Sequence, residues 1–202
     1  MENLHLIVGL GNPGSEYAKT RHNAGFLVLE RVAEHSHAKW SLEKKFNARI
    51  ARVESDGKRA LLCEPQTFMN SSGEAVAKVL DFYQTTPARL LVVVDDADLP
   101  LGEIRMRPSG SSGGHHGLES IEQHLGTRDY ARLRIGIGRQ DGAREITGYV
   151  LGRFSSTEAE LMDKVLAVAC DQLECWLNSG IQKAMNQFNG VVVDPEKERE
   201  EQ

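Results

Sequence analysis

The stretch VGLGNPGSEYAKTRHNAG, residues 8–25, is where the fold can first be inferred, because it joins a short apolar run to a helical pattern. The apolar run, residues 4–8, predicts a buried β-strand, and residues 9–14 match the G-x-G-x-x-G pattern of dinucleotide-binding turns. In such a turn the helix begins at the third glycine, so that its free N–H groups hold the pyrophosphate. Here the helical pattern begins only at Ala24, after a polar loop. The stretch therefore favours a strand, a turn and a polar loop over a dinucleotide site.

Strand and helix patterns alternate along the rest of the chain. Strands are expected at residues 47–53, 59–65, 90–94, 103–107 and 131–137, and helices at residues 24–35, 70–83, 116–125 and 157–177. Asp56 and Gly57 predict a tight hairpin between the first two of these strands. We therefore expect an α/β fold, a single three-layer domain with a mixed, mostly parallel central sheet flanked by helices, over residues 1–190.

The composition is that of an ordinary globular protein. The 202 residues are 40% hydrophobic and 26% charged, and no apolar run approaches the roughly 18 residues of a membrane span. The three cysteines form no C-x-x-C pair, which favours reduced, buried thiols. We expect a cytoplasmic protein that makes no membrane contact. The acidic segment at residues 191–202 is expected to be a disordered tail.

Charge is unevenly distributed along the chain. The net charge is −5, yet residues 128–144 contain five arginines and two aspartates. Because charges within a Debye length govern binding more than the total does, this stripe can serve as a phosphate-binding surface. A solvated face without a ligand is the competing interpretation.

Polar side chains follow two of the expected strands. Asn12 comes after the first strand, Asp95 ends the central one, and His22 lies in the polar loop. Ligands of open α/β sheets bind outside the carboxyl ends of the strands, so these side chains can meet there. A histidine in a polar loop is a candidate general base, although a structural role is equally open from the sequence.

Two further patterns are weaker. Residues 110–114 match the G-x-S-x-G nucleophile elbow, but the histidine that should follow at a distance is missing, because His124 lies inside the next expected helix. The adjacent His115 and His116 would point in different directions and lack an accompanying H-E-x-x-H motif or cysteine pair. We therefore expect neither a serine nucleophile nor a metal site.

Three blocks together carry a specific resemblance. They are GLGNPGSEYAKTRHNAGF (residues 9–26), EPQTFMNSSGEAV (residues 64–76) and VVDDADLPLGEIRMRPSGSSGGHHGLESI (residues 93–121). In this order and spacing they resemble the bacterial peptidyl-tRNA hydrolases, and the likeness extends to about residue 189. The family cleaves the ester that joins a peptide to the 3′-terminal ribose of tRNA. The resemblance thus implies a monomeric hydrolase of translation that binds the acceptor stem and 3′ end of peptidyl-tRNA and needs no cofactor or metal.

The resemblance also assigns roles to particular residues. It implies that His22 is the general base, that Asp95 orients its imidazole, and that Asn12 positions the substrate. Substrate and tRNA contacts are implied at Tyr17, Phe68, Met69, Asn70, Arg107, His116 and Arg134. We expect either Phe68 or Met69 to pack in the core instead. His116 stands where the family usually has asparagine, and a neutral imidazole offers fewer hydrogen bonds than an amide.

Two other functions remain open from the sequence. A non-catalytic RNA-binding protein is one, because a chloroplast intron-splicing factor resembles the same family. An esterase that acts on small acyl esters is the other. The presence of His22, Asp95, Asn12 and Asn70 together favours hydrolysis of peptidyl-tRNA.

Overall fold

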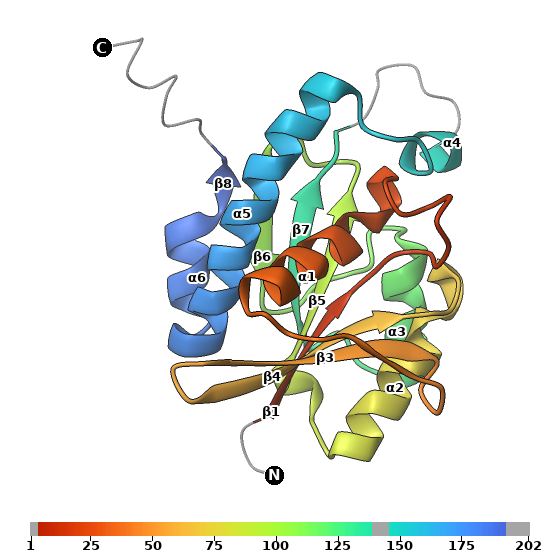
Figure 1. The fold of residues 1–202 in the computed structure, drawn as a ribbon, viewed down its shortest axis with the longest axis vertical. Coiled ribbons are helices and arrows are strands. Elements are labelled where there is room, and N and C mark those ends of the chain that lie inside the picture. The colour runs from red at the N-terminus through yellow and green to blue at the C-terminus, as the bar shows by residue number, and fades with distance from the viewer. Residues whose placement is uncertain (1–3, 139–145, 193–202) are drawn as a thin grey trace.

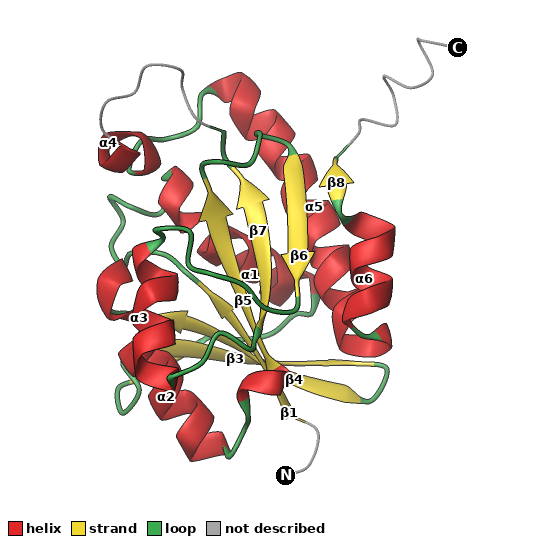
Figure 2. Ribbon diagram, turned by 180° about the vertical axis from the view of Figure 1, so that it is seen from behind, coloured by secondary structure: helices red, strands yellow, loops and turns green. Residues whose placement is uncertain are grey.

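The computed structural model describes residues 4–138 and 146–192, and within them an eight-stranded sheet lies between helices (Figures 1 and 2). The strands are β1 Leu4–Gly9, β2 Ser41–Glu43, β3 Ala48–Ser55, β4 Lys58–Pro65, β5 Leu90–Asp96, β6 Glu103–Arg107, β7 Ala131–Gly136 and β8 Gly190–Val191. The α-helices are α1 Ala24–His35, α2 Ser72–Tyr83, α3 His116–Leu125, α4 Ile146–Val150, α5 Ser156–Ser179 and α6 Ile181–Phe188. Short 3₁₀ helices are η1 Arg21–Asn23, η2 Met69–Ser71 and η3 Pro87–Arg89.

The sheet is parallel at its centre and antiparallel at its edges. Its order is β2-β3-β4-β1-β5-β7-β6-β8. β1 pairs in parallel with β4 and β5, and β5 pairs in parallel with β7. The hairpin of β3 and β4 and the strands β6 and β8 supply the antiparallel pairs. The expected mixed sheet with a parallel core is confirmed, as is the tight turn at Asp56 and Gly57, both of which have positive φ.

Alternating side chains of the strands build two separate cores. On the face seen in front in Figure 1, α1, α5 and α6 cover residues such as Ile7, Leu91 and Val93. On the opposite face α2 and α3 cover their strand neighbours, such as Val8 and Val92 (Figure 2). A layer of helices covers each face of the sheet. The central strands therefore need apolar side chains at every position. The three-layer architecture expected from the sequence is confirmed.

Several short elements have sequence patterns too weak to predict them. β2, β8, α4 and α6 are all short, and β8 exists only because Gly190 and Val191 pair with β6. The sheet therefore continues past the expected domain end at residue 190, and the Val192 amide also donates to the Gly102 carbonyl at 2.7 Å. The rest of the expected tail, residues 193–202, lies outside the described residues, as do Arg139 and Arg144 of the arginine stripe.

Two glycines let α1 lie directly against the ends of the central strands. A Cβ atom on Gly25 would lie 2.4 Å from the Leu10 nitrogen and 2.5 Å from the Val93 oxygen, and one on Gly9 would lie 2.4 Å from the Gly25 oxygen. Such contacts are too short for any side chain. This close approach brings η1, the 3₁₀ turn that precedes α1, next to the end of β5. In the described part of the chain, no helix is both long and apolar enough to cross a membrane.

Candidate active site at the carboxyl edge of the sheet

A cavity of about 240 Å³ opens where β1 and β5 end. Its walls come from the turn after β1, η1, the end of β5, the segment before α3, and α4. The polar lining comprises Asn12, His22, Asp95, Asp96, Asp98, His115, His116, Arg134 and Thr147. The carboxyl edge of the sheet, where the sequence places the first candidates, therefore does bring Asn12, His22 and Asp95 together.

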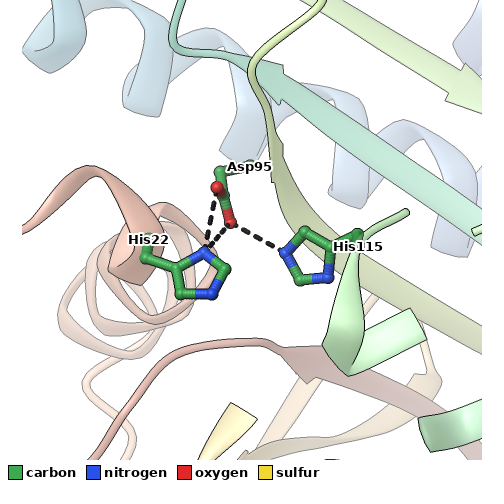
Figure 3. A group of neighbouring side chains, drawn as sticks. All are labelled: His22, Asp95 and His115. Carbon is green, nitrogen blue, oxygen red and sulfur yellow. Dashed lines mark hydrogen bonds and ion pairs between the residues drawn. The ribbon is translucent and has the colours of Figure 1, made fainter. Parts of the chain in front are cut away.

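The centre of the cavity is a carboxylate between two imidazoles (Figure 3). Asp95 Oδ1 and Oδ2 lie 3.0 Å and 3.1 Å from His22 Nδ1, and Asp95 Oδ1 lies 3.0 Å from His115 Nε2. Asp95 is 3% exposed, so its charge is shielded from bulk water. The arrangement resembles the acid–histidine pair of hydrolases, with a second histidine on the same oxygen.

The hydrogen bonds determine which ring nitrogens carry protons. His115 Nδ1 accepts from the backbone amides of Gly117 and Leu118 at the start of α3, so its Nε2 must be the donor to Asp95. An ionised Asp95 can only accept, so His22 Nδ1 also donates to it. His22 Nε2 then carries the lone pair, and it points away from Asp95 (Figure 3). His22 is thus held in the orientation that leaves Nε2 as its acceptor atom.

The electrostatics keep Asp95 ionised. Burial alone would raise the pKa of its carboxyl, but the electrostatic attraction and hydrogen bonds of the His115 and His22 ring N–H groups outweigh burial and hold that pKa well below its usual value. A permanently charged carboxylate stabilises an imidazolium that forms beside it. Asp95 therefore presents an ionised acceptor to both ring N–H groups.

Asn12 is held by three hydrogen bonds. Its backbone N–H donates to Asn23 Oδ1 and its carbonyl accepts from Asn23 Nδ2, both at 2.9 Å. Asn23 occupies the N-cap position directly before α1, but its side chain forms no capping bond there and holds Asn12 instead. The Asn12 Oδ1 atom accepts from the Met69 amide at 2.8 Å. Since Oδ1 is engaged, Asn12 presents Nδ2 as its remaining donor.

The segment that contains Phe68, Met69 and Asn70 divides between core and surface. Met69 is 5% exposed and packs in the core under α2 and α3, whereas Phe68 is 64% exposed. The expectation that one of the two is a core residue is confirmed, with Met69 in the core. Asn70 is exposed, and Tyr17 is half-buried in the loop after β1. Among the described residues that line the cavity, none of these four appears.

His115 is the site residue that sequence reasoning missed. His115 and His116 do point in different directions, as expected: His115 reaches Asp95, while the side chain of His116 is 73% exposed and bonds Glu119 at 3.0 Å. The residue expected from the resemblance, His116, lines the outer part of the cavity. The available signal was the position of His115 directly before a predicted helix, where a side chain can cap the helix.

The two expected phosphate-contacting arginines have different surroundings. Arg107 is exposed on β6. Arg134 on β7 is only 16% exposed at its side chain, and its guanidinium donates to Asp96 at 3.0 Å and to the Ser111 carbonyl at 2.8 Å. Arg132, almost fully buried, bonds the same carbonyl at 3.1 Å. Arg134 thus holds the loop that leads to His115.

The three central side chains are also of types that can bind a metal ion. Within the described residues, the ligand atoms of His22, Asp95 and His115 all lie within 4.8 Å of one another. These atoms could hold a cation only by giving up the hydrogen bonds that join them. The expectation of a metal-independent enzyme stays a prediction.

The fold and the site define the class: a three-layer α/β protein with a mixed sheet and a histidine–carboxylate pair at the carboxyl edge of its central strands. Residues 6–199 match the sequence model of the family described as peptidyl-tRNA hydrolase. The chain belongs to the peptidyl-tRNA hydrolase family, as the sequence resemblance predicted.

Individual relatives agree with the family assignment. The chain is 49% identical over 186 residues to the peptidyl-tRNA hydrolase of Synechococcus sp. strain JA-3-3Ab, covering 92% of this chain and 83% of the relative. It is 41% identical over 191 residues to that of Brevibacillus brevis, covering 93% and 99%. A solved peptidyl-tRNA hydrolase in complex with N-propanol superimposes with a TM-score of 0.90 at 39% identity, covering 96% and 98%. The Acinetobacter baumannii enzyme gives 0.89 at 40%, covering 95% and 97%.

Proposed function

We propose that the protein hydrolyses the ester bond between peptide and tRNA in peptidyl-tRNA, with His22 as the general base that activates water. One observation carries the assignment of the base: His22 Nδ1 is bound to the buried Asp95 carboxylate, which leaves Nε2 as the basic atom beside the cavity. General-base catalysis contributes about 10²–10⁴-fold, and an ester, unlike an amide, has a good leaving group.

In the proposed reaction, water attacks the ester carbonyl while His22 Nε2 takes one of its protons. The tetrahedral intermediate then collapses, the bond to the ribose 3′ oxygen breaks, and the imidazolium returns the proton to that oxygen. The products are a peptide with a free carboxyl group and tRNA with a free 3′ hydroxyl. Asp95 stabilises the imidazolium between the two steps.

Asn12 is proposed to act on the carbonyl side of the reaction. Its Oδ1 is bound to the Met69 amide, so Nδ2 is oriented as a donor before the substrate arrives. Such a donor can bind a peptide carbonyl or the developing oxyanion, and a preorganised oxyanion donor is worth about 10²–10³-fold in rate. Asn70, exposed on the adjacent 3₁₀ turn, is proposed as a second substrate contact.

The remaining predicted contacts are proposed for the tRNA and the outer part of the substrate. Phe68 and Tyr17 offer rings on which a terminal base can stack. Arg107 is proposed to contact phosphate without reading sequence, and His116 to contact substrate at the cavity mouth. Arg134 can contribute its charge from its place beside Asp96. We infer a monomer that works in the cytoplasm, as the resemblance to the family implies, since ribosomes there supply the substrate.

The test is release of N-blocked aminoacyl-tRNA by the purified protein in the presence of a chelator, with wild type compared with His22→Ala at constant salt. Robust wild-type activity that is lost in the variant supports a metal-independent hydrolase with His22 as base. Tight tRNA binding without hydrolysis would move the protein to the RNA-binding class. Equal efficiency on a simple acyl-nucleoside would instead favour a small-ester esterase.

A further inference from the structure

Arg21, the residue before the proposed base, is a buried cation with its own set of partners. It is 9% exposed, and its guanidinium donates to both carboxylate oxygens of Glu158, at 3.0 Å and 2.8 Å. It also donates to the Arg153 carbonyl at 2.8 Å. Both bonds to Glu158 come from Nη2, and the bond to the Arg153 carbonyl comes from Nη1, so one planar guanidinium reaches two partners from fixed positions, which a lysine ammonium cannot reproduce. Arg21 therefore holds two segments far along the chain in fixed positions.

The guanidinium also lies over two aromatic rings. It is 4.4 Å from the ring centroid of Tyr149 and 5.2 Å from that of Phe154. Partly buried cation–π contacts of this kind stabilise the position of the ring as well as that of the cation. Since Tyr149 belongs to α4, the contact joins Arg21 to that helix.

The segment that Arg21 holds is one wall of the cavity. Ile146, Thr147, Val150 and Leu151 line the cavity from α4 and its end. The backbone adds to the connection, because the Arg21 amide donates to the Gly152 carbonyl at 2.9 Å and Thr20 forms a bridge with Arg153. α4 has only five residues, too few to be a stable helix by itself. Its place must be imposed by contacts such as those of Arg21 and the Tyr149 hydroxyl, which donates to the Ile137 carbonyl at 2.7 Å.

We propose that Arg21 is a positioning residue that couples the segment carrying His22 to the substrate-facing wall at residues 146–153. The proposal rests on the proposed function, since it assigns that wall to the substrate. The wall presents Ile146 and Leu151, both large apolar side chains that are more than a third exposed (46% and 38%), toward the same cavity as the base. Arg21 sets the separation between this apolar surface and His22, and so the fit of the substrate outside the reacting ester.

A loss of this coupling has a particular kinetic signature. The contact of His22 with Asp95 does not involve the Arg21 side chain, so we expect the base to stay intact when that side chain changes. Binding to the wall is made in both the ground state and the transition state, and its loss raises KM with little effect on kcat. A general loss of folded protein would instead lower the apparent kcat and leave KM unchanged.

The chain offers a matched control for the ion pair. Arg31 on α1 pairs with Asp163 on α5 at 2.7 Å, just as Arg21 before α1 pairs with Glu158 on α5. The Arg31 and Asp163 side chains are 37% and 64% exposed and neither lines the cavity. Arg31→Met thus removes an arginine–carboxylate link to the same helix, α5, without touching the wall.

The experiment compares Arg21→Met with Arg31→Met on N-blocked aminoacyl-tRNA, together with amide hydrogen exchange of residues 146–153. For Arg21→Met we expect KM to rise about tenfold with kcat within about threefold, an unchanged pH profile, and faster exchange in the wall. Arg31→Met should match wild type. Glu158→Gln should shift KM in the same direction, and adding it to Arg21→Met should cost no more than Arg21→Met alone.

Other outcomes overturn the proposal. Unchanged KM and unchanged exchange in Arg21→Met, or equal changes in Arg31→Met, would show that Arg21 does not position the wall. If Arg21→Met does not fold, Arg21→Lys and Glu158→Gln provide the same comparison. Failure of the proposed function is separate, because it would appear as absent hydrolysis in the wild type.

Discussion

At the scale of single residues, a connected set of hydrogen bonds fixes the orientation of the three central side chains, His22, Asp95 and His115. The helix start at α3 uses His115 Nδ1, which forces the other nitrogen of His115 onto Asp95. That bond and the one from His22 hold the carboxylate charged. The tautomer of His115 thus makes it a donor to Asp95, and the charge of Asp95 in turn fixes the tautomer of His22. Substitutions of Asp95 and His115 test these two links.

Asp95→Asn is expected to lower kcat/KM by about 10²–10⁴-fold. An asparagine amide can donate to His22 Nδ1, which would place the ring proton on Nε2 and leave no base at the cavity. The loss should appear in kcat, measured with N-blocked aminoacyl-tRNA, and the variant's tRNA affinity should stay near that of wild type. Near-normal kcat would contradict the assignment of His22 Nε2 as the base.

Substitutions of His115 and His116 are expected to change different kinetic constants. His115→Phe removes a hydrogen bond to a charged carboxylate and should reduce kcat by about 10–100-fold. His116→Ala removes a contact at the cavity mouth and should change KM while leaving kcat near the wild-type value. Steady-state kinetics on both variants make the comparison, and a matching loss of kcat in both would contradict it.

Glu64 is a buried carboxyl with consequences for stability. It is fully buried beside Arg49, which bonds its Oε2 at 2.9 Å and also bonds Glu30. Burial and then the charge of Glu30 raise the pKa of Glu64 to about 8, although Arg49 opposes the shift. Above the ordinary glutamate pKa of about 4.3, the folded state thus keeps a proton that the unfolded state releases. Stability therefore falls as pH rises from there to about 8.

Glu64→Gln removes this proton linkage. We compare the free energy of unfolding of the variant with that of wild type at pH 5.5 and at pH 8.5. The difference should shift in favour of the variant by about 1–3 kcal/mol from the lower to the higher pH. Urea unfolding at the two pH values measures the difference. The exposed Glu54→Gln on the neighbouring strand is the control and should show no such trend. An equal effect of Glu64→Gln at both pH values would argue against a raised pKa.

At the scale of elements, the site depends on how closely α1 approaches the ends of β1 and β5. Gly9 and Gly25 permit that approach, because a Cβ on either would meet backbone atoms at 2.4 Å. The 3₁₀ turn that precedes α1 then brings His22 to Asp95. The active geometry is therefore set by backbone packing as much as by the polar side chains.

Gly25→Ala is expected to move α1 outward. The added methyl group should destabilise the fold by about 1–3 kcal/mol. Because a misplacement of about 1 Å can cost about 10²-fold in rate, kcat should fall further than the loss of stability explains. Activity measured well below the melting temperature separates the two effects. A variant with full activity would show that the close contact does not position His22.

At the scale of the whole molecule, a net charge of −5 must be reconciled with a tRNA substrate. Arginines gather on the antiparallel pair of β6 and β7, where Arg107 stands opposite Arg132 and Arg105 opposite Arg134. Arg132, which is buried, and Arg134, which is partly buried, hold the loop before His115, while Arg105 and Arg107 are exposed. The outer pair is thus the part of the surface suited to phosphate.

Arg107→Glu is expected to raise KM for peptidyl-tRNA and to make KM less sensitive to salt, with little change in kcat. Each phosphate contact contributes about one unit to the slope of log affinity against log salt concentration. The control is Arg52→Glu on β3, an exposed arginine away from this pair of strands. KM values at several salt concentrations decide the matter, and an unchanged slope in Arg107→Glu would contradict a phosphate contact.

The sequence by itself determined the alternation of strands and helices, the hairpin at Asp56 and Gly57, the family, and the candidates His22, Asp95 and Asn12, because periodicity, turn chemistry and motif order are local properties of the chain. Only the tertiary structure showed that His115 rather than His116 reaches Asp95, that Asn23 holds Asn12 instead of capping α1, and that Arg134 and Arg21 are engaged internally. Those roles depend on which way a side chain points and on partners up to 137 positions away, and neighbouring residues in a sequence do not encode either.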